Sequence, residues 1–188
     1  TTALVEWLKS MEKPRYTYRV IFIPETIGSI VYLSKHLDYL KEHVIAGFNI
    51  TCIGDDRCFS YLPSRDGESL SDKVAKHVLE FTDKDYNSYS WIDKGSDEKN
   101  YCAPGVDLPI ATIMRSKYGE FPEYHTSLDN LNLITPSGLR GGFKALKKAI
   151  DVIEKNVRLI TTVIGEPNLG KRGLYPTLSK NKLAKDSI

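Results

Sequence analysis

A histidine in a polar loop is the side chain of this sequence best suited to hold a metal ion. His125 lies within Tyr124-His125-Thr126-Ser127-Leu128-Asp129-Asn130, so an acid and an amide follow it closely. A loop of this kind can present an imidazole to a metal while neighbouring carboxylates tune it. The earlier stretch Gly95-Ser96-Asp97-Glu98 supplies two carboxylates. Together the two stretches predict a hydrolase-type metal site, or the remains of one.

Glu25 is the residue best placed for proton transfer. It lies between a predicted buried strand and the start of a predicted helix, where the helix dipole favours an anion. The residues alone leave two interpretations open. Glu25 is either a charge at a helix terminus or a general base that takes a proton from a metal-bound water.

Further polar side chains follow other predicted strands. Asp55 and Asp56 come directly after Gly54, and an open zinc site accepts Asp alongside His. One of these acids is therefore a candidate metal ligand, with a solvated turn as the alternative. Ser64 and Arg65 offer a hydroxyl and a guanidinium that could orient a substrate carboxylate.

Asp97 and Glu98 are candidates for a place beside a metal-bound water or a substrate amine, because they follow a glycine and a serine at a strand end. The other three histidines, His36, His43 and His77, lie on or beside predicted helices and are interpreted as structural or surface residues. The chain has neither a glycine-rich phosphate loop with its lysine nor a Gly-x-Ser-x-Gly motif.

Strands and helices alternate in the pattern of apolar residues. We expect strands at 16–23, 46–53, 59–62 (an edge strand), 89–92 and 108–114, and helices at 4–11, 26–40, 70–81 and 143–160. The cap of the second helix is predicted to be Thr26. Such an order predicts a mostly parallel sheet covered on both faces, with ligands bound at the carboxyl ends of its strands. The polar loops that follow the strands should converge on one rim.

Composition predicts a cytoplasmic globular protein. The 188 residues are 41% apolar and 27% charged, with a net charge of +2, which gives no reason to expect nucleic acid or an anionic membrane as a partner. No apolar run approaches the ~18 residues that span a bilayer, and no signal peptide is recognisable. The three cysteines, Cys52, Cys58 and Cys102, show no close spacing, which fits a reducing compartment.

Several of these stretches resemble a known family. Gly95-Ser96-Asp97-Glu98 with Tyr101, followed by Tyr124-His125-Thr126 and Asp129, is similar to the C-terminal half of the co-catalytic zinc aminopeptidase fold. Enzymes of that group carry a Gly-Ser-Asp-His turn and later a Tyr-His-Thr turn whose histidine binds zinc. The phrases at 19–29 and 165–177 resemble a bacterial subgroup, aminopeptidase-like proteins associated with polysaccharide-biosynthesis loci.

The resemblance implies a three-layer α/β/α domain with a mixed, mostly parallel sheet over residues 1–165, followed at 166–188 by a linker or junction. It also implies release of N-terminal residues from peptides by a zinc-activated water. Glu25 matches the family's general base, and His125 matches its last zinc ligand. The residues expected either to contact the substrate or to support those that do are Ser96, Asp97, Glu98, Tyr124, Ser64 and Arg65.

The sequence also departs from that pattern. Thr26 and Thr51 stand where two carboxylate ligands are usual, which leaves Asp55 or Asp56 as substitutes, and Glu98 replaces the histidine of the Gly-Ser-Asp-His turn. The family takes another His and a bridging Asp from positions before the glutamate. We therefore expect a fragment of a longer protein, inactive when isolated, whose intact form uses zinc.

Three functions follow from this comparison. The first is a zinc-dependent aminopeptidase-like hydrolase that acts on a terminal amide of a peptide or of a small amide-bearing substrate. The second is a non-catalytic binding module that kept the fold but lost metal ligands, which Thr26 and Thr51 favour. The third keeps the pocket for another reaction, such as N-terminal cyclisation or amide hydrolysis on a modified sugar. Exposed sheet edges would make the chain self-associate, so a homo-oligomer is also expected.

Overall fold

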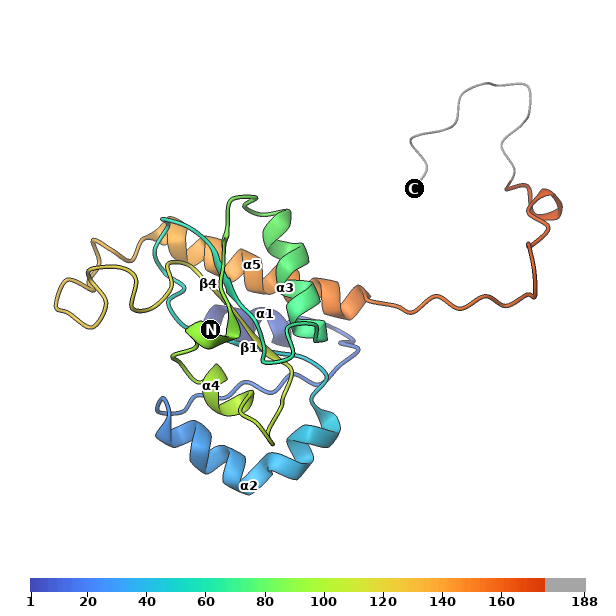
Figure 1. Ribbon diagram of the computed structural model, residues 1–188. Coiled ribbons are helices and arrows are strands. Elements are labelled where there is room, and N and C mark those ends of the chain that lie inside the picture. Colours follow the sequence, from blue (N-terminus) through green and yellow to red (C-terminus); the bar gives the residue numbers. More distant parts are fainter. Residues whose placement is uncertain (175–188) are drawn as a thin grey trace. The chain divides into compact units, whose positions relative to one another are not determined.

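The computed structural model describes residues 1–174 of the chain (Figure 1). The chain divides into two units, residues 1–156 and residues 157–188. The first unit holds a sheet and five α-helices. In the second unit the regular element among residues 157–174 is a short 3-10 helix, Gly170–Arg172. The predicted linker 166–188 lies in this second unit, and its part from residue 175 onward is outside the described residues.

The sheet has four strands in the order β1-β4-β2-β3. They are β1 (Gly47–Asn49), β2 (Ser60–Leu62), β3 (Asn87–Ser88) and β4 (Ile110–Met114). The β1–β4 and β2–β3 pairs are parallel, whereas β2 and β4 run antiparallel. The predicted strand 108–114 is therefore confirmed as the central β4, and the sheet is mixed as expected.

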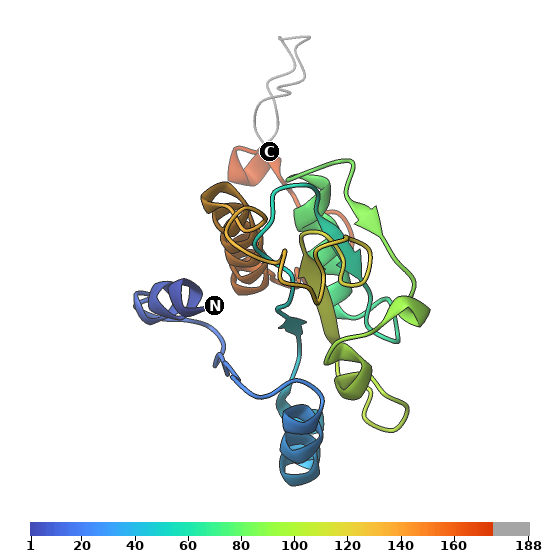
Figure 2. The same ribbon diagram turned by 90° about the vertical axis from the view of Figure 1, so that its left-hand side faces the viewer.

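Alternation along β4 separates the two helical layers. Ala111 and Ile113 point to the face that packs on α1 (Thr2–Lys9), α3 (Leu70–Glu80) and α5 (Pro136–Lys155). Ile110 points to the opposite face, where it meets α2 (Ile27–His43) and α4 (Glu98–Tyr101). Figures 1 and 2 show α2 on the far side of the strands from α5. The predicted three-layer α/β/α fold is confirmed.

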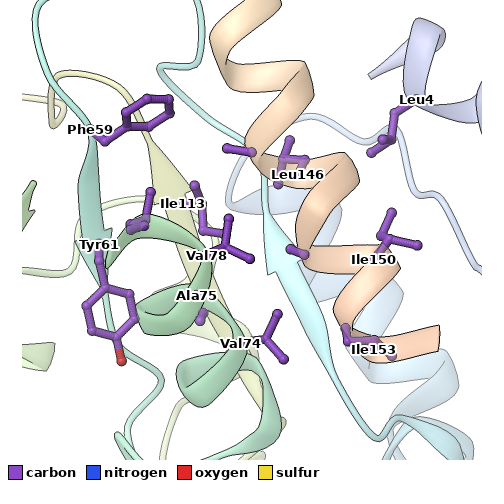
Figure 3. Close-up of a cluster of buried hydrophobic side chains, with 14 residues drawn as sticks. Leu4, Phe59, Tyr61, Val74, Ala75, Val78, Ile113, Leu146, Ile150 and Ile153 are labelled. Carbon is purple, nitrogen blue, oxygen red and sulfur yellow. The ribbon is translucent and has the colours of Figure 1, made fainter. Parts of the chain in front are cut away.

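The larger hydrophobic core lies between the sheet and α3 and α5 (Figure 3). In Figure 3 apolar side chains of α3 and α5 face one another, and Ile113 of β4, which is fully buried, lies beside them. The predicted helix 70–81 is confirmed as α3, and its Ser69 and Asp72 form a reciprocal capping box. The predicted helix 143–160 is wrong at both ends, because α5 begins at Pro136 and ends at Lys155.

The segment at 16–23 does not form the predicted central strand. It is extended, but no backbone N–H or C=O group from Thr17 to Ile23 has a hydrogen-bond partner among residues 1–174. A strand needs a partner as well as β-favouring residues, and β1 has its partner in β4. Val20, Ile21 and Phe22 are exposed instead of buried.

The other predicted strands also need correction. The stretch 46–53 contains only the three residues of β1, since Cys52 has a φ of 44° and turns the chain away. The strand predicted at 89–92 is wrong: β3 precedes it, and Trp91–Asp93 is a 3-10 helix that Ser90 caps. The stretch 59–62 is not an edge, because β2 pairs on both sides and is wholly buried.

None of the helices within residues 1–174 combines the length and the apolar character that a bilayer crossing requires.

Candidate functional site

The carboxylate of Glu25 lies at the start of α2, on the surface of the molecule. Its Oε1 accepts a hydrogen bond of 2.6 Å from Ser96 Oγ. Among the described residues no group donates to its Oε2. One oxygen of this exposed carboxylate is therefore fixed by Ser96, while the other has no partner among the described residues.

The carboxylate of Asp97 is a second link between the turn at 95–98 and the start of α2. Asp97 Oδ1 accepts hydrogen bonds of 2.8 Å from the Thr26 N–H and 2.8 Å from Ser29 Oγ. Asn100 Nδ2 donates to the same hydroxyl of Ser29 at 2.9 Å. This arrangement replaces the predicted cap: Thr26 makes no side-chain cap and has a φ of 65°, which is unusual for a β-branched residue.

Glu98 stabilises the turn at 95–98 from the interior of the protein. It is fully buried, and its Oε1 accepts hydrogen bonds from the backbone N–H of Gly95 (2.8 Å) and Ser96 (2.9 Å) and from the Tyr118 hydroxyl (2.7 Å). Its Oε2 accepts from Asn49 Nδ2 at 2.7 Å. Burial and the neighbouring carboxylate raise the pKa of Tyr118, so this phenol stays a donor. Glu98 thus holds Ser96 in place and does not reach the surface.

The loop that carries His125 lies beside this group. Its imidazole is exposed and stacks on the Tyr124 ring at 3.8 Å, and His125 itself has a φ of 57°. The preceding Glu123 is fixed by Arg57 through two hydrogen bonds of 2.7 and 2.9 Å, which hold the pKa of this carboxyl below its usual range. Burial raises the pKa of Tyr124, and the nearby Glu25 carboxylate adds to the effect.

Cys52 is a neighbour that the sequence did not single out. It packs against the same small core as Tyr124, which Leu62, Met114 and Tyr118 form. Burial raises the pKa of its thiol, and the carboxylates of Asp55, Asp129 and Glu25 raise it further. Its place in the strained turn after β1 is a consequence of tertiary packing, which the sequence pattern does not reveal.

Asp55 and Asp56 make hydrogen bonds that stabilise the ends of other elements. The buried Asp55 accepts from the N–H of Ser116 at 3.0 Å and from its Oγ at 2.8 Å. Asp56 accepts from Thr135 Oγ1 at 2.7 Å and from Ser137 at the start of α5. These hydroxyls lower the pKa of Asp56.

Ser64 and Arg65 lie at a different place. They line a cavity of about 530 Å³ with Asp107 and Ser69, and neither Glu25 nor His125 belongs to its lining. Arg65 Nε donates to Asp107 at 2.8 Å. Ser64 Oγ donates to the buried Asp72 at 2.5 Å, which makes this serine a part of the α3 capping network.

The zinc ion that the resemblance implies does not fit this chain's residues alone. Within residues 1–174, no three or more His, Cys, Asp or Glu side chains are grouped so that they could hold a metal ion. A catalytic zinc usually takes three protein ligands. The structure brings Glu25, Ser96 and Asp97 together but adds no such set.

Comparison with known proteins identifies relatives. Residues 1–156 match the model of one family, a domain of unknown function, DUF4910. A Clostridium acetobutylicum protein named for polysaccharide biosynthesis and an aminopeptidase-like domain is 40% identical over 164 residues, which are 87% of this chain and 37% of that protein. A crystal structure of a C. acetobutylicum protein named as a peptidase superposes with a TM-score of 0.82 at 38% identity, covering 92% of this chain and 40% of that one.

More distant structures share the fold. The aminopeptidase from Aneurinibacillus sp. strain AM-1 is 18% identical with a TM-score of 0.55, over 75% of this chain and 33% of that chain. LapA of Legionella pneumophila is 20% identical with a TM-score of 0.52, over 69% and 37% respectively. The chain thus spans well under half the length of each relative named here, and the two distant ones show the fold only.

Proposed function

Since this chain belongs to the DUF4910 family and has the fold of aminopeptidases, we propose that it contributes the general base of a hydrolase that cleaves a terminal amide bond. The observation that supports the proposal is the hydrogen bonding of the Glu25 carboxylate. Its carboxylate is anchored at one oxygen by Ser96 and open at the other, on the rim where the His125 loop also lies.

The chemistry of this rim is proton transfer. The free Oε2 of Glu25 accepts a proton from a water molecule that attacks the amide carbon, and the same carboxyl then returns that proton to the leaving amine. Ser96 keeps the carboxylate in one orientation, and Asp97 fixes the start of α2 from which Glu25 projects. A positioned base of this kind accelerates a reaction by about 10²–10⁴-fold.

Zinc belongs to this proposal only for a protein of the relatives' length. There His125 would be one ligand, and side chains from outside residues 1–174 would have to complete the set. The proposed substrate is a peptide, or a small molecule with a free amine next to an amide.

The test is a substrate screen with a built-in specificity control. Peptides with a free N-terminus and the same peptides with an acetylated N-terminus are incubated with a protein of the relatives' length that contains this chain, with and without added zinc, and released amino acids are quantified. We expect cleavage confined to the free N-termini. Equal cleavage of the acetylated peptides would contradict an aminopeptidase-type site.

A non-catalytic binding module is the second candidate. Thr26 and Thr51 favour it, because they stand where the resemblance implies acids. The lack of a three-ligand group among residues 1–174 favours it as well. Binding of the free-amine peptides by calorimetry, without any product even in a protein of the relatives' length, would support this candidate over the hydrolase.

A further inference from the structure

Glu98 has surroundings that are unusual for a charged side chain. It is fully buried, and within residues 1–174 its carboxylate makes no ion pair. Four neutral donors surround it instead: the N–H groups of Gly95 and Ser96 and the Tyr118 hydroxyl at Oε1, and Asn49 Nδ2 at Oε2. Burial of a carboxylate is costly unless such bonds replace its hydration, so the positions of Glu98 and its donors depend on one another.

The donors to Glu98 connect the turn at 95–98 with the middle of the sheet. Asn49 is the last residue of β1, and Tyr118 follows β4, with which β1 pairs. Tyr118 also contacts the turn directly: the Gly95 N–H donates to its oxygen at 2.7 Å, and a Cβ atom at Gly95 would come within 2.7 Å of its ring. All these partners belong to this chain, so the contacts do not depend on segments that only the longer relatives have.

Ser96 connects this buried network to the rim. Its backbone N–H donates to Glu98 at 2.9 Å, and its Oγ donates to the exposed Glu25 at 2.6 Å. Ser96 itself is buried, so packing in the interior limits how its hydroxyl can move. A single residue therefore links the buried carboxylate to the carboxylate at the rim.

We propose that Glu98 is a positioning residue for the proton transfer assigned to Glu25, and that it acts through Ser96. The inference rests on the proposed function and deepens it, because it gives a group that does not reach the surface a measurable part in the reaction. That part is geometric: the side chain has the length that lets one carboxylate reach both Ser96 and Asn49. A displacement of about 1 Å can reduce a rate by about 10²-fold, so a change in this length should be visible in kcat.

Two substitutions separate the length of Glu98 from its charge, in a protein of the relatives' length that contains this chain. Glu98→Asp keeps the charge but withdraws the carboxylate by one methylene group, so it should lower kcat by about tenfold or more and leave KM unchanged. Glu98→Gln keeps the length and an acceptor oxygen for the turn. Asn49, whose side chain makes no other hydrogen bond within residues 1–174, can rotate to accept from the glutamine amide. The kcat of Glu98→Gln should therefore stay close to that of the unsubstituted protein.

A double substitution shows whether Glu98 acts through Ser96. Ser96→Ala lowers kcat by itself, because Glu25 loses its donor, and the addition of Glu98→Asp should cause no further loss, whereas independent effects would multiply. The matched control is Asp72→Glu, which also changes a buried, hydrogen-bonded acid by one methylene group, but at the start of α3. With the folded fraction measured by urea unfolding, Asp72→Glu should lower stability and leave the kcat of the folded protein unchanged.

The positioning role of Glu98 would be overturned by full activity in Glu98→Asp, by an equal loss in Asp72→Glu, or by losses that multiply with Ser96→Ala. A loss in Glu98→Gln alone would overturn it too, since charge would then be the property that matters. If Glu98→Asp did not fold, an unchanged kcat in Tyr118→Phe, which removes one donor and keeps the ring, would have the same meaning. Full activity in Glu25→Gln, or no cleavage by the unsubstituted protein, would instead overturn the proposed function and this inference with it.

Discussion

Asp97 stabilises an unfavourable backbone conformation next to the proposed base. Thr26 has a φ of 65°, and the carboxylate of Asp97 accepts both its N–H and the Ser29 hydroxyl. A residue held in such a conformation costs about 1–3 kcal/mol, so it persists only where surrounding contacts fix it. The position of Glu25 therefore depends on an acid far away in the sequence.

We expect Asp97→Ala to lower the free energy of unfolding by about 1–3 kcal/mol, because it removes two hydrogen bonds to partly buried donors. Urea titration of the unsubstituted protein and of Asp97→Ala measures this difference in the free energy of unfolding. The control is Asp38→Ala on the exposed side of α2, where a change below about 0.5 kcal/mol is expected. Equal stabilities of the two variants would show that Asp97 does not hold this helix start.

The residues of the site were only partly predictable. Glu25 and the 95–98 turn are recognisable because an acid after a strand and a Gly-Ser turn are local signals, and the structure brings them into contact. The burial of Glu98 and the place of Cys52 depend on distant residues such as Asn49 and Tyr118, which no local pattern links to them. For the same reason, the hydrogen bonds from Ser116 to Asp55 could not be predicted from the residues around Asp55.

At the scale of elements, α3 depends on one buried acid. Asp72 accepts hydrogen bonds from Tyr61, Ser64 and Ser69. Burial alone would favour its neutral form, but these donors hold its pKa below the ordinary value. A carboxyl with a lowered folded pKa contributes stability that is complete above its unfolded pKa of about 3.9 and is lost as the pH falls through the folded pKa.

Asp72→Asn should therefore destabilise the protein near neutral pH and show a shallower loss of stability between about pH 5 and pH 2. The measurement is urea unfolding across that range. Asp66→Asn, on the exposed loop nearby, is the control and should keep the full acid dependence. If Asp72→Asn lost stability with acid as steeply as the unsubstituted protein, this carboxylate would not be the group that titrates.

The glycines of α5 allow a close helix contact. They were predicted to precede the helix, but Gly138, Gly141 and Gly142 lie inside it. A Cβ atom at Gly138 would come within 2.1 Å of the Gly54 carbonyl oxygen, whereas one at Gly141 would meet side chains only, the tip of Arg115 at 3.2 Å and the Phe59 ring at 3.7 Å. The helix thus approaches the loop after β1 closely at Gly138 and also at Gly142, where a Cβ atom would come within 2.6 Å of the Ile53 carbonyl oxygen.

Gly138→Ala should destabilise the protein by about 1–3 kcal/mol, because the overpacked backbone has to shift. Gly141→Ala should change stability by less than about 1 kcal/mol, since a helical alanine is intrinsically favoured over glycine. Thermal unfolding of the pair measures the difference. Two equal losses would mean that the close contact between Gly138 and the loop after β1 does not limit the size of the side chain at this position.

The fold was predictable where one element's own pattern is strong. The period of α3 and the apolar run of β4 identify these elements without any knowledge of their neighbours. The segment at 16–23 has equally strong β propensity, yet it forms no strand, because pairing needs two segments and no segment of residues 1–174 pairs with it. Helix α5 ends at Lys155 although apolar residues continue, since Val157 and Ile160 have no core to pack on.

At the scale of the whole molecule, the chain corresponds to only a part of its longer relatives. It spans 37% of the C. acetobutylicum protein named for polysaccharide biosynthesis and 40% of the C. acetobutylicum crystal structure. Its own residues supply the sheet, the two helical layers and the rim with Glu25.

The most direct test of the central claim compares Glu25→Gln with Glu12→Gln, both in a protein of the relatives' length that contains this chain, in release of N-terminal residues from free-amine peptides. Glu12 is exposed and distant from the rim in sequence, so it controls for the loss of one charge. A general base predicts a loss of kcat of about 10²-fold or more for Glu25→Gln and none for Glu12→Gln. Full activity in the Glu25→Gln protein would contradict the assignment of this carboxylate as the base.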